Sequence, residues 1–263
     1  MEADNFMKKI FGIELSFSGN RKALSSMVIA LLVVGVALVV VGTISAYIWF
    51  WPSNPRTETM SFSDFTSLEV GSAFQVNITE SDVYSVKIIA GERIFDRIQV
   101  TQTGETLKIE VKPGIFIGTF EAKAEIAMPM LNGVDFSGAT KGRAEGFNST
   151  VKFFAKLSGA SFLEMTDFEL GDVDFELSGA SHITATGTGS DLISDVSGAS
   201  NLDLANFHVN DANIILSGAS HATINLDGRL EVNASGVSNL EYIGEPILGT
   251  INTSGGSNVN KKS

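Results

Sequence analysis

The sequence predicts an all-β fold, a single-stranded β-helix (a β-solenoid) of about 20 residues per coil, preceded by one transmembrane α-helix. Three observations lead to it: a repeated Ser-Gly peptide, strand-like alternation before the repeat, and a long uncharged run near the N-terminus. The peptide recurs at intervals of 18 to 21 residues, too short for a helix pair, and right-handed coiling is expected. Its copies begin at Phe136, Leu157, Leu177, Val196, Leu216, Ala234 and Thr253.

The first elements are a cytoplasmic tail, residues 1–23, and a transmembrane helix, residues 24–51. Within the latter, Met27–Phe50 has 24 residues without a charge, enough to cross about 30 Å of hydrocarbon. Basic residues cluster before this run and are rare after it, which places the N-terminus in the cytoplasm and the remainder outside. They are Lys8, Lys9, Arg21 and Lys22 on one side and Arg56 on the other. We expect a single-pass protein of the cell membrane; pilin-like processing near Ala23 is the alternative to a simple signal anchor.

Residues 52–59 are interpreted as a linker, because Pro52 and Pro55 stop the helix and disfavour a strand. The extracytoplasmic β-helix domain is predicted over residues 60–259, followed by a C-terminal tail, residues 260–263. Alternating apolar residues before the repeat predict antiparallel or capping strands and the first coils, which would protect an otherwise open end. These segments are Phe74–Thr79, Tyr84–Ile89 and Leu107–Lys112.

Each repeat is expected to place equivalent residues in columns about 4.8 Å apart. The first serine of each copy forms one column, and the glycine after it supplies the positive φ of a sharp corner. The apolar residues before the serines fill the interior, and we expect the alanines to form a second inward column. Those alanines are Ala139, Ala160, Ala180, Ala199 and Ala219.

Beyond the repeat, four longer segments carry a family resemblance. They are FSDFTSLEVGSAFQVNITESDVYSVKI from Phe62, TLKIEV from Thr106, IAMPML from Ile126 and LEYIGEPILGTINTSGGSNVNK from Leu240. With the LSGAS series, this pattern over about Met60 to Val259 resembles the putative auto-transporter adhesin, head GIN domain family. The resemblance implies a single exterior β-helical domain with a role in adhesion and no known catalytic residues. The N-terminal anchor departs from a complete autotransporter.

Composition restricts the chemistry of the chain. There is no cysteine, so disulfides, thiolate metal sites and cysteine nucleophiles are excluded. The net charge of −12 disfavours nucleic acid as a partner. The expected partners are the lipid bilayer, through the N-terminal helix, and a surface glycan or envelope protein.

Histidines and serines suggest two kinds of site that the coil geometry argues against. His182 and His221 occupy the same place in the repeat, but two coils separate them by about 10 Å, with Asn201 between. A shared metal ion is therefore not expected. Ser181 and His182 are adjacent in a strand and should point to opposite faces, so a serine nucleophile is not expected either.

Carboxylates dominate the stretch from Leu157 to Gly228, which contains no lysine or arginine. In Asp172-Val-Asp-Phe-Glu three of them share one face at intervals of about 7 Å, a separation that overlaps with inverting glycosidases. A polysaccharide lyase would also need a nearby cation or base, which this stretch lacks. The full set is Glu164, Asp167, Glu169, Asp172, Asp174, Glu176, Asp191, Asp195, Asp203, Asp211 and Asp227. A solvated acidic face is favoured, with weak Ca²⁺ binding as the alternative.

These observations predict a membrane-anchored cell-surface protein that serves in adhesion or envelope interaction and is not an enzyme. No catalytic, cofactor-binding or metal-binding residue is assigned, and no cofactor is expected. One alternative is a structural spacer or assembly subunit of the envelope. A less favoured alternative is a polysaccharide-active β-helix enzyme.

Overall fold

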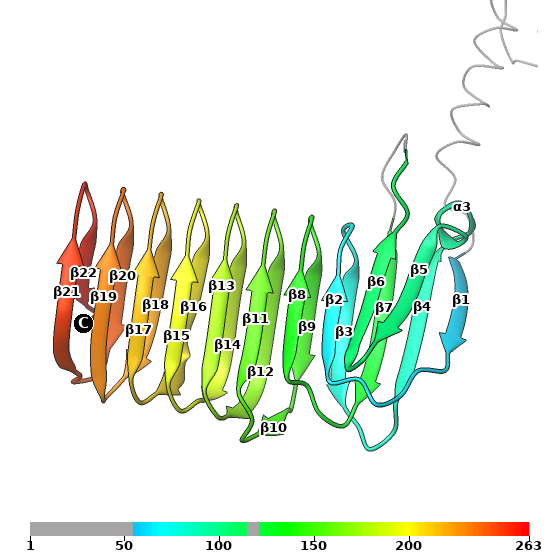
Figure 1. Cartoon of the computed structure of the whole chain (residues 1–263), viewed down its shortest axis with the longest axis horizontal. Coiled ribbons are helices and arrows are strands. Elements are labelled where there is room, and N and C mark those ends of the chain that lie inside the picture. Colours follow the sequence, from blue (N-terminus) through cyan, green and yellow to red (C-terminus); the bar gives the residue numbers. More distant parts are fainter. Residues whose placement is uncertain (1–54, 115–120, 263) are drawn as a thin grey trace, which may run out of the picture. The chain divides into compact units, whose positions relative to one another are not determined.

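The computed structural model describes residues 55–114 and 121–262, which form two β-sheets facing each other (Figure 1). Sheet A has 12 described strands in the order β1-β4-β7-β3-β9-β12-β14-β16-β18-β20-β22, with β10 beside β12. Sheet B has 10 described strands in the order β21-β19-β17-β15-β13-β11-β8-β2-β6-β5. The described residues all belong to one compact unit.

The strand bounds follow the predicted alternation. Sheet A contains β1 (Pro55–Met60), β3 (Gln75–Glu80), β4 (Ser85–Gly91), β7 (Ala122–Met128), β9 (Lys141–Glu145), β10 (Asn148–Ser149), β12 (Phe162–Leu170), β14 (His182–Thr188), β16 (Asn201–Val209), β18 (His221–Leu226), β20 (Asn239–Ile243) and β22 (Asn258–Lys261). Sheet B contains β2 (Ser67–Val70), β5 (Ile98–Thr103), β6 (Thr106–Val111), β8 (Gly133–Phe136), β11 (Phe153–Leu157), β13 (Val173–Leu177), β15 (Leu192–Val196), β17 (Ala212–Leu216), β19 (Arg229–Ala234) and β21 (Ile247–Thr253).

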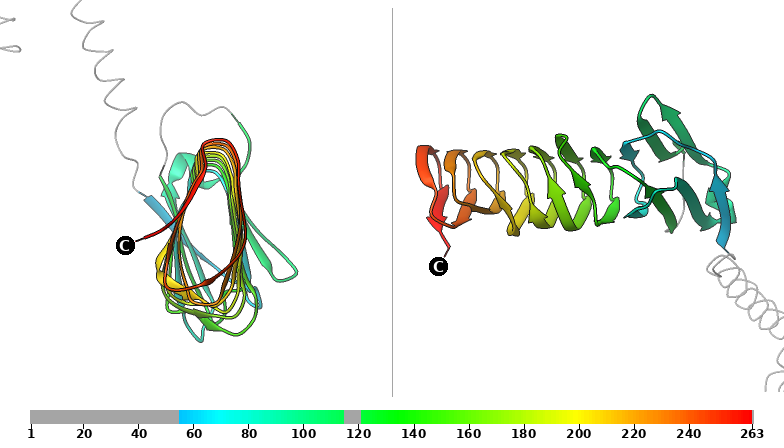
Figure 2. Two further views of the ribbon diagram at one scale, coloured as in Figure 1. Left: turned by 90° about the vertical axis from the view of Figure 1, so that its left-hand side faces the viewer. Right: turned by 90° about the horizontal axis from the view of Figure 1, so that it is seen from below.

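From β11 onward the chain alternates between the sheets, and successive coils pair in parallel, strand on equivalent strand. Paired residues are 21 apart at Phe136 and Leu157 and 18 apart at Leu216 and Ala234, so the pairing register reproduces the sequence period. Seen along its axis, the stack of coils superimposes as one flattened ring (Figure 2). The predicted β-solenoid is confirmed.

The interior is filled by the inward residue of each alternating pair. In β11, for example, Phe153, Ala155 and Leu157 are buried, whereas the two residues between them are exposed. The apolar residues that precede the Ser-Gly corners are almost completely buried, as predicted. Several of the buried side chains are phenylalanines, and Phe153 packs edge-on against Phe168 and Phe175 at centroid distances of 5.9 and 6.3 Å.

The Ser-Gly corner joins sheet B to sheet A in each coil, and its glycines adopt the predicted positive φ. The expectation that the alanines point inward is wrong: Ala160 is exposed, and the next residue, Ser161, is buried. The buried positions keep the same parity on both sides of the corner: Ala160, three residues after the buried Leu157, faces outward, and the second serine, four residues after it, faces inward. The hydroxyl of Ser161 then donates to the carbonyl of Ser158 at 2.9 Å, which satisfies a polar group inside the core.

The segment before the repeat supplies both coils and a cap, as predicted. Strand β3 is a solenoid strand, parallel to β7 and β9, whereas β4 is antiparallel to β7 and β5 is antiparallel to β6. The single helix among the described residues, α3 (Glu92–Phe95), connects β4 to β5 and buries Ile94 and Phe95 over this end of the core. Figure 1 shows α3 and β1 beyond the last full coil at this end.

The predicted domain limits shift by a few residues. Residues 55–59 of the expected linker belong to β1, which pairs antiparallel with β4. Proline excludes an interior strand, but β1 is at the edge of sheet A, where Pro55 is tolerated. At the other end, β22 extends to Lys261, into the expected tail.

The predicted cytoplasmic tail and transmembrane helix, residues 1–51, lie outside the described residues. Within residues 55–114 and 121–262, no helix is both long and apolar enough to span a bilayer.

Candidate functional site

The most regular surface feature is a column of planar side chains on the outer face of sheet A, which we call the His–Asn ladder. Strand register places its members side by side, one from each coil. They are Phe162, His182, Asn201, His221, Asn239 and Asn258. Asn201 separates the two histidines, as the repeat predicts. A shared metal site at these histidines was not expected, and the ladder itself was not predicted, although the recurrence of His or Asn directly after the second serine is visible in the sequence.

Hydrogen bonds inside the ladder fix how each imidazole is presented. Nδ1 of His182 lies 2.8 Å from Nδ2 of Asn201, and Nδ1 of His221 lies 3.2 Å from Nδ2 of Asn239. Because the amide nitrogen only donates, Nδ1 accepts in both pairs, and the proton of the neutral ring is on Nε2. The ladder therefore presents two ring N–H donors, on His182 and His221, two coils apart, with the amide of Asn201 between them.

Packing keeps the first histidine neutral. The ring of His182 is half-buried and stacks on Phe162, with a centroid distance of 5.2 Å and an interplanar angle of 2°. Burial lowers the pKa of His182, and the nearby Asp203 carboxylate opposes this only in part. A neutral imidazole is also what the hydrogen bond from Asn201 requires.

The remaining histidine and the serine–histidine pairs lie where the sequence predicted. His208 is in another part of its coil and contacts the Asp227 carboxylate at 3.1 Å. This hydrogen bond lowers the pKa of Asp227. Ser181 points into the core and donates to the carbonyl of Ser178 at 2.8 Å, whereas His182 faces outward. The two side chains are on opposite faces of the sheet and cannot act as nucleophile and base.

Of the carboxylates in Asp172-Val-Asp-Phe-Glu, Asp174 and Glu176 lie on the outer face of sheet B and each contacts a lysine, whereas Asp172 lies in the turn before β13. Lys152, from the preceding coil, contacts Asp174 at 2.8 Å, and Lys156 contacts Glu176 at 3.1 Å. Neither lysine was predicted to lie here, because both precede the acidic stretch in the chain and only the coil register brings them alongside the carboxylates. Hydrogen bonds to these carboxylates raise the pKa of both lysines, so they are held protonated and are poor general bases.

A second acidic row runs along the turns from sheet A to sheet B. Asp172, Asp191 and Asp211 follow one another in successive coils, and each of the first two accepts a 3.4 Å hydrogen bond from the backbone N–H of the next. All three are exposed. Across residues 55–114 and 121–262, no three or more acidic or histidine side chains converge in a group that could hold a metal ion.

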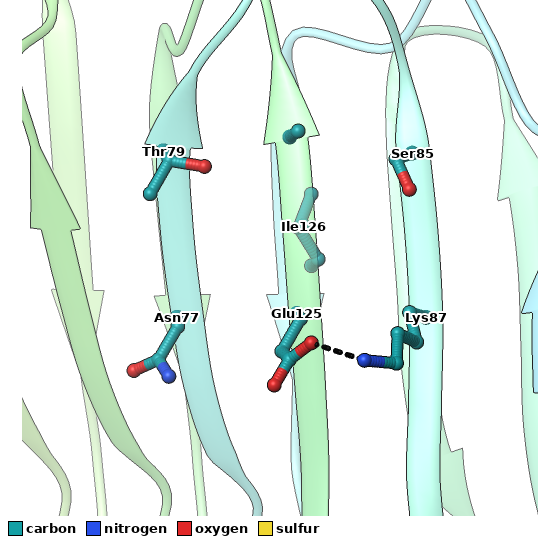
Figure 3. A pocket seen from close by; sticks show the side chains of 7 residues that line it. Asn77, Thr79, Ser85, Lys87, Glu125 and Ile126 are labelled. Atoms are coloured by element: carbon teal, nitrogen blue, oxygen red, sulfur yellow. Dashed lines mark hydrogen bonds and ion pairs between the residues drawn. The ribbon is translucent and has the colours of Figure 1, made fainter. Parts of the chain in front are cut away.

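One open depression lies on sheet A near the capped end, between β3, β7 and β4 (Figure 3). Its lining combines apolar surface, including Ile126, with polar side chains, and the Lys87 ammonium and the Glu125 carboxylate form an ion pair across it at 2.8 Å. The neighbouring lining residues are Asn77, Thr79, Ser85 and Ala127. None of these side chains forms a nucleophile–base pair, so the depression offers contacts and no evident chemistry.

Comparison with known proteins agrees with this architecture. A putative adhesin from Bacteroides fragilis has a similar crystal structure, with a TM-score of 0.74 and 19% identity over 80% of this chain and 99% of its own. A putative adhesin from Parabacteroides distasonis has a TM-score of 0.60 and 15% identity, and the match covers 80% of this chain and 98% of that one. A putative lipid binding protein from the same species has a TM-score of 0.56 and 17% identity, and the match covers 80% of this chain and 97% of that one. At such identities the likeness shows the fold alone. No curated protein matches the chain significantly.

The family model described as putative auto-transporter adhesin, head GIN domain, matches residues 64–246, which include most of the cap, all but the last of the Ser-Gly corners and most of the His–Asn ladder. That range is well over half of the chain. The chain belongs to the putative auto-transporter adhesin, head GIN domain family.

Proposed function

We propose that this protein is a membrane-anchored cell-surface module that binds a surface glycan or envelope protein without catalysing a reaction, and that the His–Asn ladder is its contact face. Membership of an adhesin family supports an adhesin-like role. The uncharged run at residues 27–50 supports an anchor that leaves the solenoid outside the cell.

The His–Asn ladder is the main observation that supports this proposal, because it repeats one arrangement of planar groups in successive coils. Half-buried imidazoles and amides at a spacing of about 4.8 Å present flat faces and fixed hydrogen-bonding edges. Such groups lose little conformational entropy when they bind, since the stack already orders them. A repeating polymer or another regular surface can contact several rungs at once, so weak contacts add up.

The observations at the acidic groups support a non-catalytic role. Asp174 and Glu176 are ion-paired with protonated lysines, and the Ser181 hydroxyl points into the core, away from His182. Polysaccharide cleavage would need two carboxyl groups with separated pKa values facing one substrate bond.

The test is binding of the 52–263 fragment to intact cells and isolated envelope, first with Ca²⁺ and then with a chelator. Asn201→Glu places a charge in the centre of the ladder, and Asn213→Glu places the same charge on the outer face of sheet B, on the next strand. We expect saturable binding that Asn201→Glu weakens at least tenfold and Asn213→Glu leaves unchanged.

Three outcomes would redirect the proposal. Equal loss in both variants would show that charge, and not the ladder, controls binding. Loss on chelation alone would assign the contact to the acidic rows. No saturable binding under any condition would overturn the adhesion role and favour a structural spacer of the envelope.

A further inference from the structure

Within the described residues the two ends of the solenoid differ, because no described strand covers β21 and β22 at the C-terminal end. Leu248 is 52% exposed, although its partner one coil earlier, Leu230, is 0% exposed. Ile251 and Val259 are likewise only partly buried. Their partners, Val232 and Leu240, are completely buried. These side chains occupy the inward columns of the core and lack only the next coil that would cover them.

The same end presents two strand edges. Strands β21 and β22 are the outermost strands of sheets B and A, so each leaves a row of backbone N–H and C=O groups unpaired within the described structure (Figure 1). Such edges are templates for pairing with another strand. A partner that satisfies both at once must offer two strands at the spacing of the two sheets, with an apolar layer between them. Another solenoid end meets this requirement.

The N-terminal end cannot serve as that partner. Helix α3 covers the core there, with Ile94 and Phe95 buried, and the Arg56 guanidinium packs over the Phe95 ring at 4.3 Å from its centroid. Arg56 also forms an ion pair with Glu58 on the edge strand β1. A charged, covered end disfavours head-to-tail stacking into filaments.

Charge further favours contact between two C-terminal ends. The eleven carboxylates between Leu157 and Gly228, without a lysine or arginine among them, oppose side-by-side association of two copies. The last coil, residues 239–262, has two glutamates and two lysines, so its formal charge is zero. Lys261 contacts Glu245, and Lys262 contacts Glu241 at 3.3 Å, so these charges are already paired when two such ends meet.

We propose that the C-terminal end of the solenoid is a self-association surface, at which a second copy of this chain stacks end to end through a two-fold axis. A two-fold axis perpendicular to the solenoid makes the meeting edge strands antiparallel, which is a regular way to pair β-sheet edges. The apolar centre of the contact is formed by Leu248, Ile251 and Val259 from both copies. This proposal goes beyond the adhesive role and does not depend on the His–Asn ladder.

Sedimentation of the 52–263 fragment over a range of concentrations tests it, since these residues form a compact unit with a continuous core. Leu248→Lys places a charge in the proposed contact, and Val83→Lys makes the same change at a 70% exposed apolar residue near the capped end. We expect a monomer–dimer equilibrium that Leu248→Lys weakens at least tenfold and Val83→Lys leaves unchanged. Because Leu248 is exposed, both variants should fold, which circular dichroism checks.

Cross-linking of the full chain in membranes provides a second readout, because the protein has no cysteine of its own. A single Asn258→Cys in β22 should yield a disulfide-linked or maleimide-linked dimer, and Asn201→Cys in the middle of the same face should not. A fragment that remains monomeric at about 1 mM, or dimers that Leu248→Lys and Val83→Lys weaken equally, would overturn the proposal. If Leu248→Lys is monomeric and still binds envelope, the self-association and the adhesive role are separate properties.

Discussion

The glycine column at the Ser-Gly corners offers the sharpest test of how the coils are held together. Gly179 has φ of +78°, and a Cβ added there would lie 2.4 Å from the carbonyl oxygen of Gly159 in the preceding coil. That oxygen accepts the inter-coil hydrogen bond from the backbone N–H of Ala180 at 2.7 Å. Gly179→Ala therefore adds left-handed strain of about 1–2 kcal/mol. It also adds a backbone clash that costs about 1–3 kcal/mol, as overpacking does.

The matched control is Gly104→Ala, in the turn between β5 and β6. Gly104 also has positive φ, +57°, but nothing lies within 4 Å of its ideal Cβ. Gly104→Ala should therefore lower the free energy of unfolding only by the left-handed strain, about 1–2 kcal/mol. Equilibrium urea denaturation of the 52–263 fragment, followed by circular dichroism, measures both losses of unfolding free energy. Equal losses in the two variants would refute the idea that close approach between coils, in addition to backbone conformation, demands glycine at the corner.

Three further predictions concern the same fragment. Ser181→Ala removes a buried hydroxyl that donates to the Ser178 carbonyl and should cost about 1 kcal/mol. In contrast, Ser220→Ala should be neutral or stabilising, because its buried hydroxyl has no hydrogen-bond partner in the described structure; urea midpoints of the pair check this. Burial lowers the pKa of His182 in the folded state, so the unfolded chain takes up the proton first as pH falls below about 6.5, and stability decreases. His182→Asn should reduce this acid-side loss, measured from pH 7 to 5, and an unchanged pH dependence would contradict the assignment. Burial and neighbouring carboxylates raise the pKa of Asp135, so the folded state binds its proton more tightly. Asp135→Asn should therefore raise the urea midpoint at pH 7, and this gain should shrink as the pH falls through the folded pKa.

The repeat sequence was sufficient to predict the solenoid, because the coil period and the alternation of buried residues are both local properties. Two residues that are one coil length apart in the sequence stack on each other in the solenoid. Leu157, Leu177 and Leu216 are therefore buried as predicted. The orientation of Ala160 was predicted wrongly, although it lies three residues after the buried Leu157, so strand alternation continued through the corner places it outward and Ser161 inward.

The sequence by itself therefore determined the coil length, the inward columns and the glycine corners, all of which depend on residues close together in the chain. Only the tertiary structure decided which side chains meet across coils. Lys152 reaches Asp174, 22 residues later, and His182 stacks on Phe162 because parallel register, not proximity in the chain, brings them together. The open C-terminal end likewise emerges only in three dimensions: Leu248 resembles any core leucine in the sequence, and it is exposed because no further described coil stacks on it.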